Sequence, residues 1–397
     1  MQKHVLIIGA GPVGLVSASL LSEKGISVTM LETAPSLPHD LRASTFHPPT
    51  LDMLDRFGVV PAMIEQGLIC PDWQFRDRTD GVVATFELGL LKGETNHPYR
   101  LQCEQWRLGE MLLERLQRNP LVTIVFGAKV TELQQTDNEV IAKATFADRT
   151  PETFRADFCI GADGIGSIAR QTIGAEFAGR TIPEIFLTIS TTFDFSQIMP
   201  DVSNIAYISD PTQWYVLIRT AKVWRALFPV NPELNDEAVT DPEAARQLLQ
   251  TVWRKPEPYE VSHRTGYRVH ERVASYYTKG RIAIAGDAAH VNNPLGGMGL
   301  NGGIHDAFNL ASAIEAFFNK EPSDVLGRYE RQRRKVALDV VQQTTLRNRA
   351  ILNTQDPAAR TAYYDELRRT VANEATHKEY LMRTSMISSL RDVAKID

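Results

Sequence analysis

A glycine-rich turn near the start of the chain constrains the fold more than any other feature. Residues 5–8 are a continuous apolar run, which is typical of a buried parallel strand. Gly9, Gly11 and Gly14 follow directly at the spacing GxGxxG, and a helix and a second strand are predicted after them. In such a βαβ unit the glycines allow a tight turn, the approach of a pyrophosphate and close helix packing. The sequence therefore predicts a dinucleotide-binding unit.

A carboxylate stands where the ribose of the dinucleotide would lie. The second strand, residues 26–31, ends at Glu32, about 20 residues after the glycine turn, where an acidic residue takes the ribose hydroxyls. A helix is predicted over residues 15–24, so the free amides at its start and its dipole would face the pyrophosphate. This motif alone does not separate NAD from FAD, although Glu32 disfavours a 2′-phosphate.

Two later segments also combine glycine and aspartate after a predicted strand. Strand residues 158–160 lead into Gly161-Ala162-Asp163-Gly164 and then a helix. Strand residues 281–285 lead into Gly286-Asp287, and the glycine-rich sequence of residues 294–301 opens a long helix. Gly161-Ala162-Asp163-Gly164 does not have the GxGxxG spacing of a second nucleotide-binding unit.

The three motifs, in this order and spacing, resemble the class A (single-component) FAD-dependent aromatic hydroxylases of the 4-hydroxybenzoate hydroxylase type. The resemblance covers nearly the whole chain. It implies that the first motif holds the ADP part of FAD, that Asp163 serves FAD and NAD(P)H, and that Asp287 meets the ribitol. The cofactor-binding residues that it implies are Gly9, Gly11, Pro12, Val13, Gly14, Glu32, Arg42, Gln105, Asp163, Gly286, Asp287, Pro294, Gly297, Gly299, Leu300 and Asn301.

The expected fold is α/β, with a Rossmann-like FAD-binding domain and an inserted antiparallel sheet. Residues about 181–230 alternate apolar and polar side chains, are rich in β-branched and aromatic residues, and predict that sheet. We expect a discontinuous FAD domain of residues 1–180 and 276–330, a substrate-binding sheet of residues 181–275, and C-terminal helices over residues 331–397.

The resemblance implies a monooxygenase that hydroxylates a phenolic or N-heteroaromatic substrate. NADH or NADPH would reduce the flavin, dioxygen would add at C4a to give a hydroperoxide, and one oxygen atom would pass to the ring. A larger polycyclic, polyketide or quinone-type substrate is the alternative within this class. The alternative from another class is a plain NAD-dependent dehydrogenase. Such an enzyme would use only the first motif, and the Gly286-Asp287 segment would then have no cofactor to bind.

The substrate side offers fewer candidates. His47, in the loop after Arg42, is the leading general base, because a histidine titrates near neutral pH; the alternative is a histidine that caps the next helix. Tyr207, Tyr215 and Arg219 are expected to contact substrate, with Tyr215 close enough to the reacting ring to be called catalytic. Packing within the sheet and structural ion pairing are the alternatives for Tyr215 and Arg219.

The composition of the chain limits which molecules it is expected to bind. The 397 residues carry a formal net charge of -5, so no basic excess favours a nucleic acid. Cys70, Cys103 and Cys159 match no metal-binding spacing, and we expect buried thiols, no bound metal and a cytoplasmic protein. No apolar run reaches the length of about 18 residues that a membrane span needs. The basic run at residues 329–335 predicts a solvated helix face or a contact in a homodimer.

Overall fold

The N-terminal βαβ unit lies at the centre of a six-stranded sheet. The computed structural model describes residues 2–39, 43–321 and 324–397. β1 pairs in parallel with β2 on one side and β12 on the other, and the side chains of residues 5–8 are buried as their apolar run predicts. The strands, in spatial order, are β18 (Thr278–Lys279), β19 (Ile282–Ile284), β12 (Phe158–Gly161), β1 (His4–Ile8), β2 (Ser27–Glu32) and β8 (Val122–Phe126).

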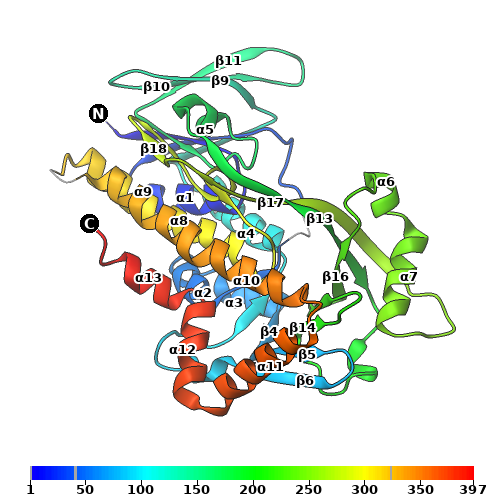
Figure 1. Ribbon diagram of the computed structural model, residues 1–397. Coiled ribbons are helices and arrows are strands. Elements are labelled where there is room, and N and C mark those ends of the chain that lie inside the picture. Colours follow the sequence, from blue (N-terminus) through cyan, green and yellow to red (C-terminus); the bar gives the residue numbers. More distant parts are fainter. Residues whose placement is uncertain (1, 40–42, 322–323) are drawn as a thin grey trace.

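A second sheet of eight strands forms the other half of the molecule (Figure 1). It contains the antiparallel strands expected between residues 181 and 275. It also takes in a hairpin from the N-terminal part, whose first strand β5 pairs in parallel with β14. In spatial order the strands are β20 (His290–Val291), β17 (Val261–Ala274), β13 (Phe177–Thr191), β16 (Trp224–Val230), β15 (Tyr215–Arg219), β14 (Ile205–Ser209), β5 (Asp72–Asp77) and β6 (Gly81–Glu87).

Two small sheets complete the strands. In the first, β7 pairs with both neighbours and brings the loop around Thr45 beside Gln102. The second is an antiparallel meander beside the parallel sheet, at the top of Figure 1. The strands are β3 (Thr45–Phe46), β7 (Arg100–Gln102) and β4 (Leu68–Cys70), and then β11 (Pro151–Ala156), β10 (Val140–Thr145) and β9 (Lys129–Gln135).

Helices cover both sheets. α1 packs against α4 and α8 in the core of the parallel sheet, and α11 and α12 cover the hairpin of β5 and β6. The α-helices are α1 (Pro12–Glu23), α2 (Pro48–Leu54), α3 (Val60–Gln66), α4 (Gln105–Gln117), α5 (Ile168–Ile173), α6 (Asp236–Val239), α7 (Pro242–Val252), α8 (Met298–Phe318), α9 (Val325–Lys335), α10 (Gln343–Leu352), α11 (Pro357–Ala372), α12 (Glu374–Thr384) and α13 (Ile387–Val393). The shorter helical turns are η1 (Asp55–Phe57), η2 (Leu88–Leu91), η3 (Phe195–Gln197), η4 (Gly286–Ala288) and the π-helix η5 (Val336–Gln342).

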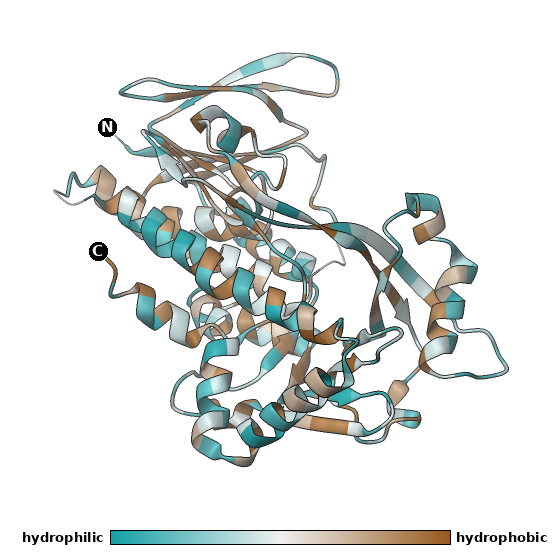
Figure 2. Cartoon of the chain, viewed as in Figure 1, coloured by the Kyte–Doolittle hydropathy of each residue, from teal (hydrophilic) through white to brown (hydrophobic). Residues whose placement is uncertain are grey.

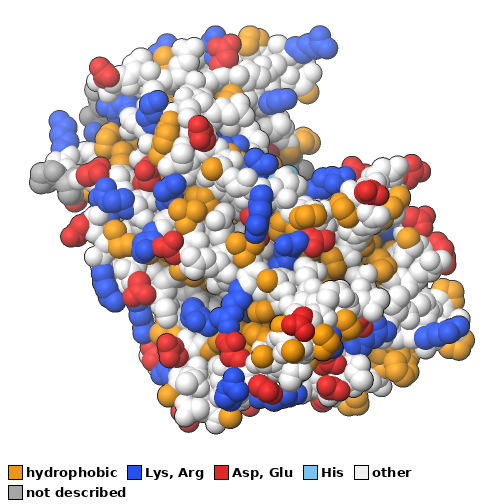
Figure 3. Space-filling model, in the orientation of Figure 1, with side chains coloured by type: hydrophobic (Ala, Val, Ile, Leu, Met, Phe, Trp, Pro, Cys, Tyr) orange, Lys and Arg blue, Asp and Glu red, His pale blue; other side chains and the backbone are white. Residues whose placement is uncertain are grey.

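The surface in view mixes both signs of charge (Figure 3), in line with the small net charge. α9 carries the basic run and is drawn mainly in hydrophilic colours in Figure 2. Its Arg333 is nevertheless 2% exposed and paired inside the protein, so the basic run is only partly a solvated face. Within residues 2–39, 43–321 and 324–397, no helix has both the length and the apolar character to cross a membrane.

Candidate active site

The glycines of the first motif have the separate tasks that their positions predict. Gly9 has a φ of +100°, and a Cβ there would lie 2.3 Å from the Ala162 carbonyl oxygen. A Cβ at Gly14 would lie 2.0 Å from the Gly9 carbonyl oxygen. Gly11, at the N-cap of α1, faces open space instead, with nothing within 4 Å of its added Cβ. That open space at the start of a helix suits a pyrophosphate.

Glu32 lies beneath this turn and braces it. Its carboxylate accepts hydrogen bonds from the backbone amides of Ala10, at 2.7 Å, and Ala34, at 2.8 Å. A carboxylate has about four acceptor sites, so capacity remains on both oxygens for ribose hydroxyls. Glu32 is therefore both a structural brace and a candidate ribose ligand.

Asp163 is turned into the protein. One carboxylate oxygen accepts from the amides of Ile168 and Ala169 at the start of α5, at 2.7 and 3.2 Å. Burial raises the pKa of this carboxyl. Its neighbours Ala162 and Gly164 line the central cavity, whereas Asp163 does not. Asp163 thus caps α5 through one carboxylate oxygen, while its Oδ1 is buried without a hydrogen-bond partner, and the cofactor contact expected from the sequence stays a prediction.

One large cavity runs between the three motifs and the second sheet, with a volume of about 470 Å³. Its course from the open space at Gly11 to the loop before α8 matches an elongated dinucleotide. The predicted cofactor residues on its wall are Gly11, Pro12, Val13, Gln105, Gly286, Asp287, Pro294, Gly297, Gly299 and Leu300. These residues fit FAD, with glycine backbone against the flat ring and the N-terminus of the 21-residue α8 directed at it. Arg42 lies outside the described residues.

Asn301 holds the loop before α8 without reaching the cavity. It is fully buried, accepts from the His47 amide at 2.9 Å, and donates to the carbonyl oxygens of Thr45 and Gly297 at 2.9 and 2.6 Å. It therefore ties the loop around Thr45 to the glycine-rich loop. This role explains a conspicuous asparagine at the end of the motif without direct cofactor contact.

His47 is also buried in this junction. Its Nε2 donates to the Gly296 carbonyl oxygen at 2.9 Å, so the proton sits on Nε2 and Nδ1 is unprotonated. Burial is the main cause that holds the pKa of His47 well below its ordinary value, with Arg100 adding to it. The side chain is not on the cavity wall, and it does not cap α2. The structure places His47 as a support of the Gly296–Gly297 turn rather than beside a substrate.

Tyr207 and Arg100 meet at the cavity wall beside the same loop. The Tyr207 hydroxyl accepts a hydrogen bond from the Gly296 amide at 3.0 Å and one from the Arg100 guanidinium. Burial raises the pKa of Tyr207 and lowers that of Arg100. Tyr207 is on the cavity wall, where its expected contact with substrate stays a prediction, whereas Arg100 was missed. Its one sequence signal, a cation inside a short strand five residues before Gln105, is too weak to find it.

The expected pocket positions of Tyr215 and Arg219 need correction. Tyr215 points into the core behind the sheet, where its ring centroid is 5.7 Å from that of Phe228, and burial raises its pKa to about 12. Arg219 pairs with Asp194 at 3.3 Å. The residues of β15 that face the cavity are the alternate ones, Val216 and Ile218. The alternation along the strand was right, but the face turned toward the pocket was wrong.

A buried ionic network supports the Gly286-Asp287 turn from behind. Asp306 of α8 accepts from the Gly286 amide at 3.0 Å and pairs with His290 at 2.7 Å and Arg333 at 2.6 Å. Burial alone would raise the pKa of Asp306, but its contacts with His290 and Arg333 outweigh burial and hold the pKa below its ordinary value. His290 thus has a structural role behind this turn.

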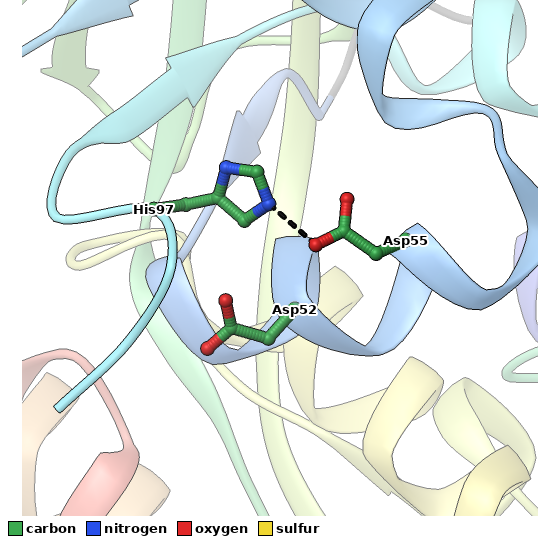
Figure 4. A group of neighbouring side chains, drawn as sticks. All are labelled: Asp52, Asp55 and His97. Atoms are coloured by element: carbon green, nitrogen blue, oxygen red, sulfur yellow. Dashed lines mark hydrogen bonds and ion pairs between the residues drawn. The ribbon is translucent and has the colours of Figure 1, made fainter. Parts of the chain in front are cut away.

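Another group of acidic and histidine side chains lies apart from the cavity. Asp52, Asp55 and His97 gather near α2 (Figure 4). His97 Nε2 contacts the Asp55 carboxylate at 2.7 Å, and Nδ1 contacts the Tyr99 hydroxyl at 2.8 Å. Because both ring nitrogens have partners, this group is explained as a hydrogen-bonded cluster that fixes the loop of His97 to α2 and η1.

Comparison with known proteins agrees with this site. The family model described as "FAD binding domain" matches residues 2–344. The para-nitrophenol 4-monooxygenase of Pseudomonas sp. (strain WBC-3) is 32% identical over 98% of this chain and 97% of its own. The 6-hydroxy-3-succinoylpyridine 3-monooxygenase of Pseudomonas putida (strain DSM 28022 / S16) is 32% identical over 90% of this chain and 91% of its own.

Solved structures give the same result. The crystal structure of p-nitrophenol 4-monooxygenase from Pseudomonas putida DLL-E4 has a TM-score of 0.88 and 30% identity, with 98% of each chain covered. A flavin-dependent monooxygenase solved with FAD and substrate shares the fold, with a TM-score of 0.80, 22% identity, and 98% of this chain and 72% of that chain covered.

Fold and site together define a flavoprotein monooxygenase that binds FAD and uses NAD(P)H and dioxygen. The chain belongs to the FAD-binding-domain family and, within it, to the class A FAD-dependent aromatic hydroxylases. The family resemblance, the α/β fold class and the aromatic hydroxylation expected from the sequence are confirmed. The plain NAD-dependent dehydrogenase is thereby excluded.

Proposed function

We propose that this monooxygenase hydroxylates a small para-substituted phenol of the para-nitrophenol type. The observation that carries the proposal is the wall of the cavity beyond the Pro294–Leu300 loop. The side chains that the second sheet places there are mainly apolar, as a benzene ring requires, and among the polar ones Tyr207 and Arg100 meet beside the Pro294–Leu300 loop. Thr188, Arg225 and Tyr267 also line the wall. The apolar side chains on the sheet side are Ile205, Val216, Ile218 and Leu227.

Tyr207 is proposed to contact the phenol oxygen. Within the described residues, the hydrogen bonds that reach its hydroxyl come from donors, the Gly296 amide and the Arg100 guanidinium. Its own proton is therefore left to donate to a substrate oxygen. The same hydroxyl links substrate position to the glycine-rich loop, because it holds the Gly296 amide.

The overall reaction would place one oxygen atom of dioxygen on the ring and release the other as water, with NAD(P)H supplying two electrons. FAD, when bound, supplies the redox chemistry that activates dioxygen. The protein's part is to bind the ring in an apolar wall that excludes water and to hold its hydroxyl at Tyr207. Candidate cofactor contacts are those on the cavity wall, with Glu32 at the ribose.

A turnover screen tests this proposal. The holoenzyme is given NADH or NADPH with para-nitrophenol, other para-substituted phenols, hydroxypyridines and polycyclic phenols, and products are identified by mass spectrometry. We expect para-substituted phenols to stimulate NAD(P)H oxidation most strongly, with a product one oxygen richer or its descendant. Stronger stimulation by polycyclic phenols, with hydroxylated polycyclic products, would replace the proposal by the larger-substrate alternative.

A further inference from the structure

Arg100 is a buried cation that lacks an anionic partner in the described part of the chain. Its side chain comes from β7, and the residue is 3% exposed. Its Nε has no hydrogen-bond partner. By contrast Arg225, which lies on the same cavity wall, pairs with the Glu104 carboxylate at 3.6 Å. A buried charge without a counter-ion is costly, so its retention calls for an explanation.

The groups around Arg100 do not neutralise it. Those that act on it electrostatically include Tyr207 of β14, Tyr380 of α12 and Cys70 of β4. His47 also interacts with it, and burial holds the pKa of His47 well below its ordinary value, so this imidazole is neutral. Burial raises the pKa of both tyrosines, and it raises that of Cys70 to about 12, so all three are neutral near pH 7. The indole ring of Trp73, whose centroid is 5.3 Å from the guanidinium carbon, completes the surroundings. This electron-rich face helps to hold a cation but does not cancel its charge.

An anion has far more room on one side of Arg100 than on the other. Arg100 lies between the large cavity and a small one of about 30 Å³ walled by Trp73, Phe75 and Tyr380. With about 30 Å³ against about 470 Å³, the small cavity offers an organic anion far less room than the large one. The Arg100 guanidinium lies on the wall of the large cavity, next to the Tyr207 hydroxyl.

From this geometry we infer that Arg100 binds the phenolate oxygen of the aromatic substrate and makes the anion, rather than the neutral phenol, the bound form. The inference rests on the proposed function and deepens it. The O–H bond of the phenol breaks, its proton leaves to water, and the electron pair stays on the oxygen. That oxygen accepts from the Arg100 guanidinium and from the Tyr207 hydroxyl. A phenolate ring is more electron-rich, so binding prepares it for oxygen transfer.

Binding to the oxidised holoenzyme without NAD(P)H tests the inference apart from turnover. The probes are para-nitrophenol, which changes its absorption when it ionises, and its methyl ether, which has no proton to lose. We expect wild type to lower the pKa of bound para-nitrophenol by about 1 to 3, as a close opposite charge does. Arg100→Met should abolish this change and weaken para-nitrophenol binding about 10- to 100-fold, since a charge-assisted hydrogen bond is lost. It should leave binding of the methyl ether unchanged.

Arg219→Gln is the matched control. It removes the arginine that sequence analysis placed at the substrate, but which pairs with Asp194 on the other face of the sheet. This variant should bind and ionise para-nitrophenol like wild type. Arg100→Lys, which keeps the charge, should restore part of the ionisation. FAD content, measured for each variant, separates loss of substrate binding from loss of the flavin site.

Several results would overturn the inference. One is wild-type protein in which bound para-nitrophenol ionises with the same pKa as in solution or with a higher one, a measurement that stands even if Arg100→Met fails to fold. Another is equal weakening of para-nitrophenol and its methyl ether by Arg100→Met. If wild type binds the anion but never hydroxylates it, the proposed function fails and the role of Arg100 stands. If no phenol binds, both fail.

Discussion

At the scale of single residues, the buried polar groups around the cavity decide how firmly its loops are held. Asp306 joins the Gly286 amide, His290 and Arg333 in a site that water does not reach. Asp306→Asn would leave the Arg333 guanidinium without its counter-ion. We expect the free energy of unfolding to fall by about 3–5 kcal/mol, the usual result of breaking a buried pair. Chemical denaturation measures this, and gel filtration measures the accompanying loss of FAD.

The control for Asp306→Asn is Asp339→Asn, which removes an exposed pair with Lys335 one helical turn away. That change should alter the free energy of unfolding by less than about 1 kcal/mol. Equal effects of the two substitutions would contradict the role given to the buried network.

A buried histidine should make stability depend on pH. Burial is the main cause that lowers the pKa of His305 from 6.5 to about 3. Its Nε2 contacts the Thr50 hydroxyl at 2.9 Å. Between pH 6.5 and pH 3 the unfolded chain binds a proton at this residue and the folded protein does not. The stabilisation is therefore complete above pH 6.5 and lost as the pH falls, with a slope on the order of 1.4 kcal/mol per pH unit.

Urea denaturation at pH 7 and pH 5 of wild type and His305→Gln measures this contribution. The variant is expected to be less stable at pH 7 because a buried residue changes, but its stability should fall less between the two pH values. An identical fall in both proteins would show that His305 does not carry the dependence.

Residue roles were predictable where backbone geometry alone demands a residue type. Gly9 and Gly14 stand where a Cβ would collide with backbone, and such demands are visible in the motif spacing. The substrate face of β15 was not predictable, because a shift of one residue exchanges the two faces of a strand and both faces are apolar here. Arg100 was missed because its role depends on which side chains the fold brings around it. No carboxylate from the described segments pairs with it, and a local sequence pattern does not reveal this.

At the scale of elements, the turn between β1 and α1 combines a packing requirement with a binding requirement, and two glycine substitutions separate them. Gly14→Ala puts a Cβ against the Gly9 carbonyl oxygen and should destabilise the protein even without cofactor, by about 1–3 kcal/mol as overpacking does. Gly11→Ala faces open space, so the apoprotein should keep its stability while FAD affinity falls. Thermal unfolding of apoprotein and flavin titration measure the two effects.

A Gly11→Ala variant that binds FAD like wild type would place the pyrophosphate elsewhere.

The first βαβ unit and the strands of the second sheet were predicted because their patterns are local. The β5–β6 hairpin was not assigned to the second sheet. It joins that sheet through parallel pairing of β5 with β14, more than 120 residues later in the chain, which no local pattern reveals.

At the scale of the whole molecule, the cavity is built from segments that are distant in sequence. Its walls come from the first βαβ unit, from β7 and α4, from the second sheet, and from the loop before α8. The discontinuous arrangement that the three motifs suggested therefore agrees with the cavity. The expected domain boundaries stay predictions, and so do the homodimer and the cytoplasmic location.

The central claim is that this cavity makes the protein an FAD-dependent aromatic monooxygenase acting on a phenol. The most direct test supplies flavin-loaded protein with NAD(P)H, para-nitrophenol and isotopically labelled dioxygen. Mass spectrometry then follows label in the aromatic product at early times. We predict stimulated NAD(P)H oxidation and one labelled oxygen atom in each product molecule. Oxidation of NAD(P)H that the phenol does not alter, with no label in any aromatic product, would contradict the proposed substrate. The same result with every aromatic compound in the screen would contradict the claim itself.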